Sequence, residues 1–163
     1  MSYIAKPLIL SGVSKARIED KVRILPGLRM EIIGENASIH IERNTSIGQN
    51  FHIISASNMI IKKNTTISGN VFISNLDHSY EKIGVHILDQ DHIIKETIIG
   101  ENCFIGYGVS IQAGTILGNQ CIVGSNSVVK GEFPDYCVIA GVPARIIKRY
   151  NPKTKRWEKN NDK

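Results

Sequence analysis

Aliphatic residues recur at every sixth position through the second half of this 163-residue chain. Glycine directly follows four of the six aliphatic residues, and the fifth position of the first five units holds a small or β-branched residue. A fixed period of this kind indicates a repeat architecture, in which each unit buries its apolar residue against the units above and below it. The unbroken series consists of Ile99, Ile105, Ile111, Leu117, Val123 and Val129.

The same six-residue step occurs earlier in the chain, in three shorter series that are offset from one another by two residues. Ile18 and Ile24 give a degenerate first turn before them. Because the step is the same throughout, one coil architecture accounts for the chain before and after each offset. The three shorter series are Ile33–Ile39, Ile41–Ile47–Ile53 and Ile61–Ile67–Ile73.

The fourth position of the repeat is nearly always asparagine or glycine. These residues accept a left-handed backbone conformation most readily, so their recurrence predicts a tight corner at every sixth position. A short strand and a corner, repeated three times in eighteen residues, close one turn of a triangular coil. The pattern predicts an all-β fold and argues against a β-sandwich and against amphipathic helices. The ten corner positions are Asn36, Asn44, Asn50, Asn64, Asn70, Asn102, Gly108, Gly114, Gln120 and Asn126.

The first interruption of the repeat is a loop over about residues 75–97. It contains three of the five histidines, His78, His86 and His92, together with three aspartates. Insertions of this length in compact repeat proteins are usually either functional or disordered, and the mixed composition of this one favours function. We therefore expect the chemistry of the protein to depend on this loop.

The second interruption lies near the C-terminus, where Pro134 and Pro143 end the coil and a short helix is expected over 144–150. Such an element would protect the open end of a solenoid. We expect a single structural domain, in which a β-helix over 1–130 carries the inserted loop. A C-terminal cap with a basic tail would then occupy 131–163.

The net charge of +5 arises from the C-terminal end of the chain. Residues 145–163 hold eight Lys or Arg against two acidic residues, a charge of +6, which leaves −1 for residues 1–144. A basic segment attracts polyanions such as a nucleotide, an acidic glycan or a membrane surface. Nucleic-acid binding is disfavoured, because the tail has few aromatic residues and the rest of the chain is slightly acidic.

Composition also limits where the protein works and what its cysteines do. No apolar run approaches the roughly 20 residues of a membrane span, and the N-terminus lacks a signal pattern. We therefore expect a cytoplasmic protein without a transmembrane segment. No two cysteines form a CxxC pair, and Cys103 and Cys121 occupy equivalent repeat positions, so we expect them to stack as small core residues.

Three segments resemble the hexapeptide-repeat acetyltransferases: Ile98–Gly118, Val123–Val129 and Ala140–Lys148. The resemblance covers about residues 30–150. It implies a left-handed parallel β-helix, a homotrimer with active sites between subunits, and acetyl-CoA as co-substrate without a metal. It is closest to the branch that O-acetylates sugars, and so implies transfer to a carbohydrate acceptor in cell-surface polysaccharide (O-antigen or capsule) biosynthesis.

The catalytic histidine of this family lies on the loop that interrupts the coil, and Asp77–His78 matches that pattern. The resemblance therefore implies His78 as the general base, which a sugar hydroxyl needs in order to attack a thioester near neutral pH. Asp77 would position the substrate or the loop, and Asp89 or Asp91 would be alternatives for orienting the imidazole.

The family binds CoA with residues on its last coils and its C-terminal cap. This sequence departs from the family pattern after Val129, where Lys130–Gly131 replaces Thr-Lys, and at Asn126, which replaces glycine. Lys130 can still reach a phosphate. The implied cofactor-binding residues are Gly106, Tyr107, Ser125, Lys130, Arg145 and Lys148.

Three other functions remain open at this level. A histidine base would serve equally well for N-acetylation of an amino sugar or of a nucleotide-linked amino sugar. A zinc enzyme of the γ-carbonic-anhydrase type needs three histidines from adjacent coils, whereas three histidines here crowd into one loop. A non-catalytic binding module would not need the residues that resemble a CoA site.

Overall fold

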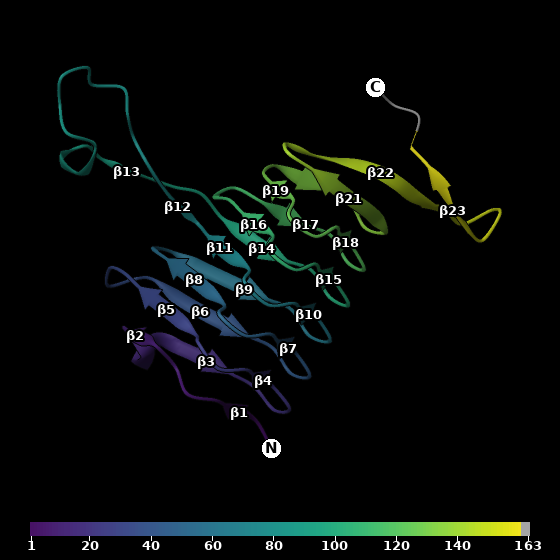
Figure 1. Cartoon of the computed structure of the whole chain (residues 1–163), viewed down its shortest axis with the longest axis horizontal. Coiled ribbons are helices and arrows are strands. Elements are labelled where there is room, and N and C mark those ends of the chain that lie inside the picture. Colours follow the sequence, from purple (N-terminus) through teal and green to yellow (C-terminus); the bar gives the residue numbers. More distant parts are fainter. Residues whose placement is uncertain (161–163) are drawn as a thin grey trace.

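The computed structural model describes residues 1–160, so the last three residues of the basic tail, 161–163, lie outside the described part. The chain winds into a coil whose three sides are sheets of short parallel strands (Figure 1). Sheet 1 contains β1 (Tyr3–Ile4), β4 (Arg23–Ile24), β7 (Ser46–Ile47), β10 (Thr66–Ile67), β15 (Phe104–Ile105), β18 (Ile122–Val123), β21 (Cys137–Gly141), β22 (Ala144–Asn151) and β23 (Arg156–Lys159).

The other two sides are six-stranded. Sheet 2 contains β2 (Ile9–Ser11), β5 (Arg29–Ile32), β8 (His52–Ser55), β11 (Phe72–Ser74), β16 (Ser110–Ile111) and β19 (Val128–Val129). Sheet 3 contains β3 (Ala16–Ile18), β6 (Ser38–Ile41), β9 (Asn58–Ile61), β14 (Thr97–Ile99), β17 (Ile116–Leu117) and β20 (Glu132–Phe133). A 3₁₀ turn, η1 (Val13–Lys15), joins β2 to β3.

The core is a set of aliphatic stacks that run along the coil. In sheet 1, each inward side chain sits directly above its counterpart in the coil below, because the parallel register pairs them without offset. The predicted inward position of the repeat is therefore confirmed, and the small offsets in the sequence are absorbed at the corners. The stack contains Ile24, Ile47, Ile67, Ile105, Val123 and Ile139, all of them buried.

The corners follow the prediction at nine of the ten positions, which have φ between 51° and 86°. Asn36 is the exception, because Gly34 takes the left-handed conformation of that corner, with φ of 93°. Corner asparagines also bind one another along the coil: the Asn44 side-chain amide donates to Asn64 at 2.9 Å, and Asn50 donates to Asn70 at 3.0 Å.

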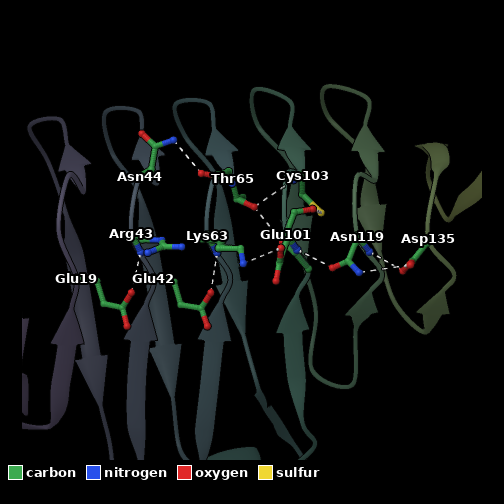
Figure 2. Close-up of polar contacts among 12 residues, drawn as sticks. Glu19, Glu42, Arg43, Asn44, Lys63, Thr65, Glu101, Cys103, Asn119 and Asp135 are labelled. Atoms are coloured by element: carbon green, nitrogen blue, oxygen red, sulfur yellow. Dashed lines mark hydrogen bonds and ion pairs between the residues drawn. The ribbon is translucent and has the colours of Figure 1, made fainter.

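Backbone amides beside the corners between sheets 3 and 1 are satisfied by side chains of the neighbouring coil (Figure 2). Glu19 accepts from the Arg43 N–H at 3.1 Å, and Asp135 accepts from the Asn119 N–H at 2.7 Å. The hydrogen bond between Glu19 and His40, together with the Arg43 N–H, lowers the pKa of the Glu19 carboxyl. These contacts replace hydrogen bonds that regular sheet pairing does not supply at a turn.

The cysteines stack as expected. Cys103, Cys121 and Cys137 are buried, free thiols at equivalent positions of three successive coils, in the column that Thr45 and Thr65 occupy in earlier coils. Contact with Cys103 and burial raise the pKa of the Cys121 thiol, and burial raises that of Cys137. Both groups therefore remain neutral members of the core.

The prediction of a C-terminal helix over 144–150 is wrong. Residues Ala144–Asn151 form strand β22, which pairs antiparallel with β21, and β23 then pairs with β22. The reason is that β21 would otherwise leave an open sheet edge, and the β-branched pair Ile146 and Ile147 suits a strand that covers it. Parallel pairing also continues past residue 130, since β20 pairs with β17 and β21 with β18. Within residues 1–160, no helix is long and apolar enough to cross a membrane.

Candidate active site

The predicted loop leaves the coil after β11, at the corner between sheets 2 and 3, and projects away from it (Figure 1). Its base is a short antiparallel ribbon of β12 (Leu76–His78) and β13 (His92–Ile94), in which His78 lies opposite His92. Asn75 anchors the base, since its buried side chain donates to the Ser55 and Ser57 hydroxyls and accepts from the Ala56 N–H. The loop therefore begins from a fixed point.

Gln90 organises the tip of the loop. Its side chain is buried and makes three hydrogen bonds with the backbone: it accepts from the Lys82 N–H and donates to the Lys82 and Val85 carbonyls. The tip also contains the 3₁₀ turn η2 (Ile87–Asp89), and the His86 Nδ1 caps this turn by accepting from the Leu88 N–H. His86 thus serves the shape of the loop.

We expect Gln90→Ala to loosen the tip without unfolding the coil. Losing these hydrogen bonds should raise amide hydrogen exchange of residues 82–90 by about tenfold or more. Exchange of the core amides of β10 and β15 should stay unchanged. Hydrogen-exchange mass spectrometry measures both, and equal loss of protection in the coil would show that the loop does not open independently.

His78 is half-buried, and its Nδ1 atom is enclosed without a hydrogen-bond partner among residues 1–160. Its ring lies edge-on to that of His92, with the centroids 4.9 Å apart. The expected carboxylate partner of the imidazole is not seen in this part of the chain. Asp77 accepts from the backbone N–H of His78 at 2.9 Å, and Asp91 lies 3.8 Å from the Lys82 ammonium. A buried polar atom without a partner is uncommon in folded proteins, and a catalytic role is one explanation for it.

Asp77 and Lys130 meet at the base of the loop, with 3.7 Å between Asp77 Oδ2 and Lys130 Nζ. A small hollow beside them is lined by Phe72, Ser74, Leu76, Asp77, Gln112 and Ala113. The structure therefore brings together one residue expected to bind the acceptor and one expected to bind the cofactor.

A basic hollow of about 370 Å³ lies between the last coil and the hairpin of β22 and β23. Lys130 and Arg145 both line it, whereas Lys148 is outside the lining. The prediction missed Arg149, because a helix would place Arg145 and Lys148 on one face whereas strand β22 brings Arg149 to the hollow. Its lining residues are Lys130, Glu132, Phe133, Ala144, Arg145, Ile146, Arg149 and Asn160.

The other three expected cofactor residues lie at the corner between sheets 1 and 2. Gly106 is buried, and a Cβ there would come within 2.7 Å of backbone atoms of Val123 and Ser125, so only glycine allows the two coils this spacing. Tyr107 is exposed and its hydroxyl accepts from the Asn70 amide; Ser125 is also exposed. Sheet 2 separates this corner from His78, so one chain does not gather all the expected residues in one pocket.

Comparison with known proteins agrees with this architecture. Residues 96–131 match the bacterial transferase hexapeptide (six repeats) family. The putative lipopolysaccharide biosynthesis O-acetyl transferase WbbJ of Escherichia coli (strain K12) is 38% identical over 140 residues, which cover 82% of this chain and 71% of that protein. Galactoside O-acetyltransferase of the same strain is 30% identical over 139 residues, which cover 77% of this chain and 66% of that protein.

The structure of galactoside acetyltransferase in complex with coenzyme A superimposes with a TM-score of 0.75 and 26% identity, covering 91% of this chain and 72% of that chain. The similarity confirms the prediction of a left-handed parallel β-helix, whose coil direction the repeat by itself did not determine. Among residues 1–160, no group of three or more His, Cys, Asp or Glu is arranged to hold a metal ion. The chain therefore belongs to the hexapeptide-repeat acetyltransferase family and is an acyltransferase.

Proposed function

We propose that this protein transfers an acetyl group from acetyl-CoA to a hydroxyl of a sugar, in the biosynthesis of a cell-surface polysaccharide such as O-antigen or capsule. Acetyl-CoA as co-substrate is supported by the coenzyme A bound to its structural relative. The sugar acceptor is supported by relatives named for lipopolysaccharide and galactoside O-acetylation. The observation that carries the proposal is the buried Nδ1 of His78, which has no hydrogen-bond partner within residues 1–160 and lies at the base of the loop.

His78 would act as the general base. A neutral imidazole takes the proton of the sugar hydroxyl while the sugar oxygen bonds to the acetyl carbonyl carbon. The tetrahedral intermediate then collapses, the carbon–sulfur bond breaks, and the imidazolium returns the proton to the CoA sulfur. The products are an acetyl ester and a free CoA thiol, and His78 is left as it began.

The basic hollow would hold phosphate groups of CoA. Arg145 and Arg149 line it together with Lys130, whose ammonium also reaches Asp77 at the base of the catalytic loop. Guanidinium groups bind phosphate oxygens through short, charge-assisted hydrogen bonds. Lys130 would then connect the cofactor side of the site with the acceptor side.

Arg145→Ala tests this assignment. Because a hydrogen bond to a charged group contributes about 1.5–3 kcal/mol, we expect the Kd for CoA to rise by about 10–100-fold. Binding of pantetheine, which lacks the phosphates, should be unaffected. Arg43→Ala removes an exposed cation of the coil distant from the cap and serves as the control. An equal loss of affinity for CoA and for pantetheine would show that Arg145 does not bind the phosphates.

The proposed enzyme is a homotrimer in which neighbouring subunits complete each site. Two observations support this arrangement: the expected residues lie on both edges of sheet 2, and the loop tip exposes the large apolar side chains of Tyr80, Ile83 and Leu88. Exposed apolar clusters of this kind usually contact another protein surface. Sedimentation velocity should give three times the chain mass of 18.1 kDa.

The activity is tested by incubating the protein with acetyl-CoA and a panel of saccharides and measuring the release of free thiol. We expect a saccharide bearing only hydroxyl groups to raise thiol release well above the rate without acceptor. If only amino sugars raise it, the protein is an N-acetyltransferase, and if no carbohydrate does, the acceptor class is wrong.

A further inference from the structure

Three aromatic side chains gather where the C-terminal hairpin meets the last coil. The Tyr136 and Tyr150 rings have centroids 6.3 Å apart, and Tyr150 and Trp157 lie edge-on at 5.7 Å. Together with Gln120 and Pro152 they line a hollow of about 530 Å³. This volume is in the range of small-molecule sites, which combine apolar walls with a few polar groups.

Tyr136 occupies an unusual position for a tyrosine. It has φ of 60° at the corner between sheets 3 and 1, where the preceding coils have Asn44, Asn64, Asn102 and Gln120. A bulky residue in the left-handed region costs conformational energy, and such strain is concentrated at functional sites. The residue is 45% exposed, so burial in the core does not compensate for that cost.

The hairpin that forms one wall of the hollow is basic. The turn between β22 and β23 carries Lys153 and Lys155, and Arg156 is the first residue of β23. The one acid of this hairpin, Glu158, accepts hydrogen bonds from the Asn151 amide and the Thr154 hydroxyl, which lower the pKa of its carboxyl. These contacts hold the Glu158 side chain, and the basic residues of the hairpin outnumber this acid.

The hollow is separate from the catalytic loop. Tyr136 follows Lys130 by six residues, and the intervening strand β20 crosses sheet 3 from the loop corner to the opposite corner. Six residues reach at most about 20 Å even when they are fully extended, which sets an upper limit on the separation of the two corners. Figure 1 likewise shows the β12–β13 loop and the turn of the β22–β23 hairpin on opposite sides of the coil. A single sugar cannot occupy both places, whereas a chain of several sugars can.

We propose that the hollow formed by Tyr136, Tyr150 and Trp157 is an accessory site for an acidic segment of an oligosaccharide acceptor. Aromatic faces are electron-rich and pack against the C–H-bearing faces of sugar rings, while Tyr hydroxyls and the Gln120 amide suit their hydroxyl groups. The cations of the hairpin turn suit the acidic groups of the glycan. The choice of saccharide as ligand rests on the proposed function, but the site is measurable by binding alone.

Trp157 is the single tryptophan of the chain, so its fluorescence reports directly on the hollow. The probes are oligogalacturonates of two and eight residues, neutral malto-octaose and the oligonucleotide dT8. We expect a saturable fluorescence change with the acidic octamer and at least about tenfold weaker binding of the neutral one. No change with the acidic octamer would overturn the proposal, and tighter binding of dT8 would assign the site to single-stranded nucleic acid instead.

Tyr136→Asn is the informative variant, because it keeps the tryptophan reporter and restores the residue type that other corners use. We expect affinity for the acidic octamer to fall at least about tenfold while thermal stability is retained or rises. Loss of stability with unchanged affinity would make Tyr136 a packing residue and contradict the proposal. Tyr3→Asn removes a similarly exposed tyrosine far from the hairpin. It should change neither the affinity for the acidic octamer nor the thermal stability.

Kinetics separate this proposal from the proposed activity. If the enzyme is active, Tyr136→Asn should raise KM for a long acidic acceptor. The kcat should not change, and neither should KM for a short acceptor or for acetyl-CoA. Equal effects on short and long acceptors would overturn the accessory role. If no acetyl transfer is found at all, the fluorescence titration still decides whether the hollow binds saccharide.

Discussion

Replacing His78 with alanine should lower kcat for acetyl transfer by about 10²–10⁴-fold, the usual contribution of a general acid–base group. Among the loop histidines, His78 is the one with a buried ring nitrogen left unpartnered by residues 1–160. Affinity for CoA should stay the same, since the basic hollow belongs to the last coil and the hairpin. Steady-state kinetics with a saccharide acceptor and a separate CoA titration measure the two effects.

His86→Ala is the matched control. Both histidines lie on the same loop, but His86 accepts a hydrogen bond from the Leu88 amide and shapes only the 3₁₀ turn. Its replacement should change kcat severalfold at most. If His78→Ala retained full acetyl transfer, or if both variants lost activity equally, the loop would act through its shape and the assigned base would be wrong.

Replacing Ile67 with alanine should lower the free energy of unfolding by about 2–5 kcal/mol. The side chain is 1% exposed and lies between Ile47 and Ile105 in the aliphatic stack of sheet 1. The substitution would leave a cavity that neighbouring coils, hydrogen-bonded above and below, can only partly close. Urea unfolding followed by circular dichroism gives the difference.

The adjacent residue provides the control for this effect. Thr66 belongs to the same strand, faces outward and is exposed, so Thr66→Ala should change the free energy of unfolding by no more than about 0.5 kcal/mol. The contrast tests the inward and outward alternation that the six-residue period predicts. Similar losses at both positions would contradict the packing of the coil.

The coil could be predicted from the sequence because its period and its corners impose the same geometry. An inward Ile or Val and a left-handed Asn or Gly at a fixed spacing leave few alternatives, and nine of the ten predicted corners have positive φ. The prediction of a left-handed corner at Asn36 is wrong because Gly34 lies two residues earlier, and glycine accepts the left-handed conformation at lower cost. Handedness does not follow from the period; the family resemblance implied it, and the similarity to a known structure confirmed it.

The C-terminal cap was harder to predict because its conformation depends on a tertiary contact. Alone, the segment after Pro143 has few signals that separate a helix from a strand. Pairing with the open edge of β21 makes this segment a strand, β22, and the same pairing brings Arg149 to the basic hollow. Likewise, the 3.7 Å contact between Lys130 and Asp77 joins residues more than fifty positions apart, which the repeat pattern does not relate.

The position of His78 on the inserted loop was predicted from the sequence, but its immediate surroundings were not. The sequence offers Asp89 or Asp91 as the partner that orients the imidazole, and within residues 1–160 neither contacts its Nδ1. Asp77 is instead held by the backbone N–H of His78 and by Lys130. The contacts of each aspartate depend on the register of β12 and β13, and that register exists only in the folded loop.

The most direct test of the account follows the acetyl group itself. The protein is incubated with acetyl-CoA carrying ¹³C in its acetyl carbonyl and with a saccharide that bears hydroxyl groups but no amine, and the product is examined by NMR. We predict that the label appears in a sugar ester and is released as acetate by mild alkali. Label that remains in acetyl-CoA, or that is transferred only to amino sugars as an alkali-stable amide, would contradict the proposal that this protein is a sugar O-acetyltransferase.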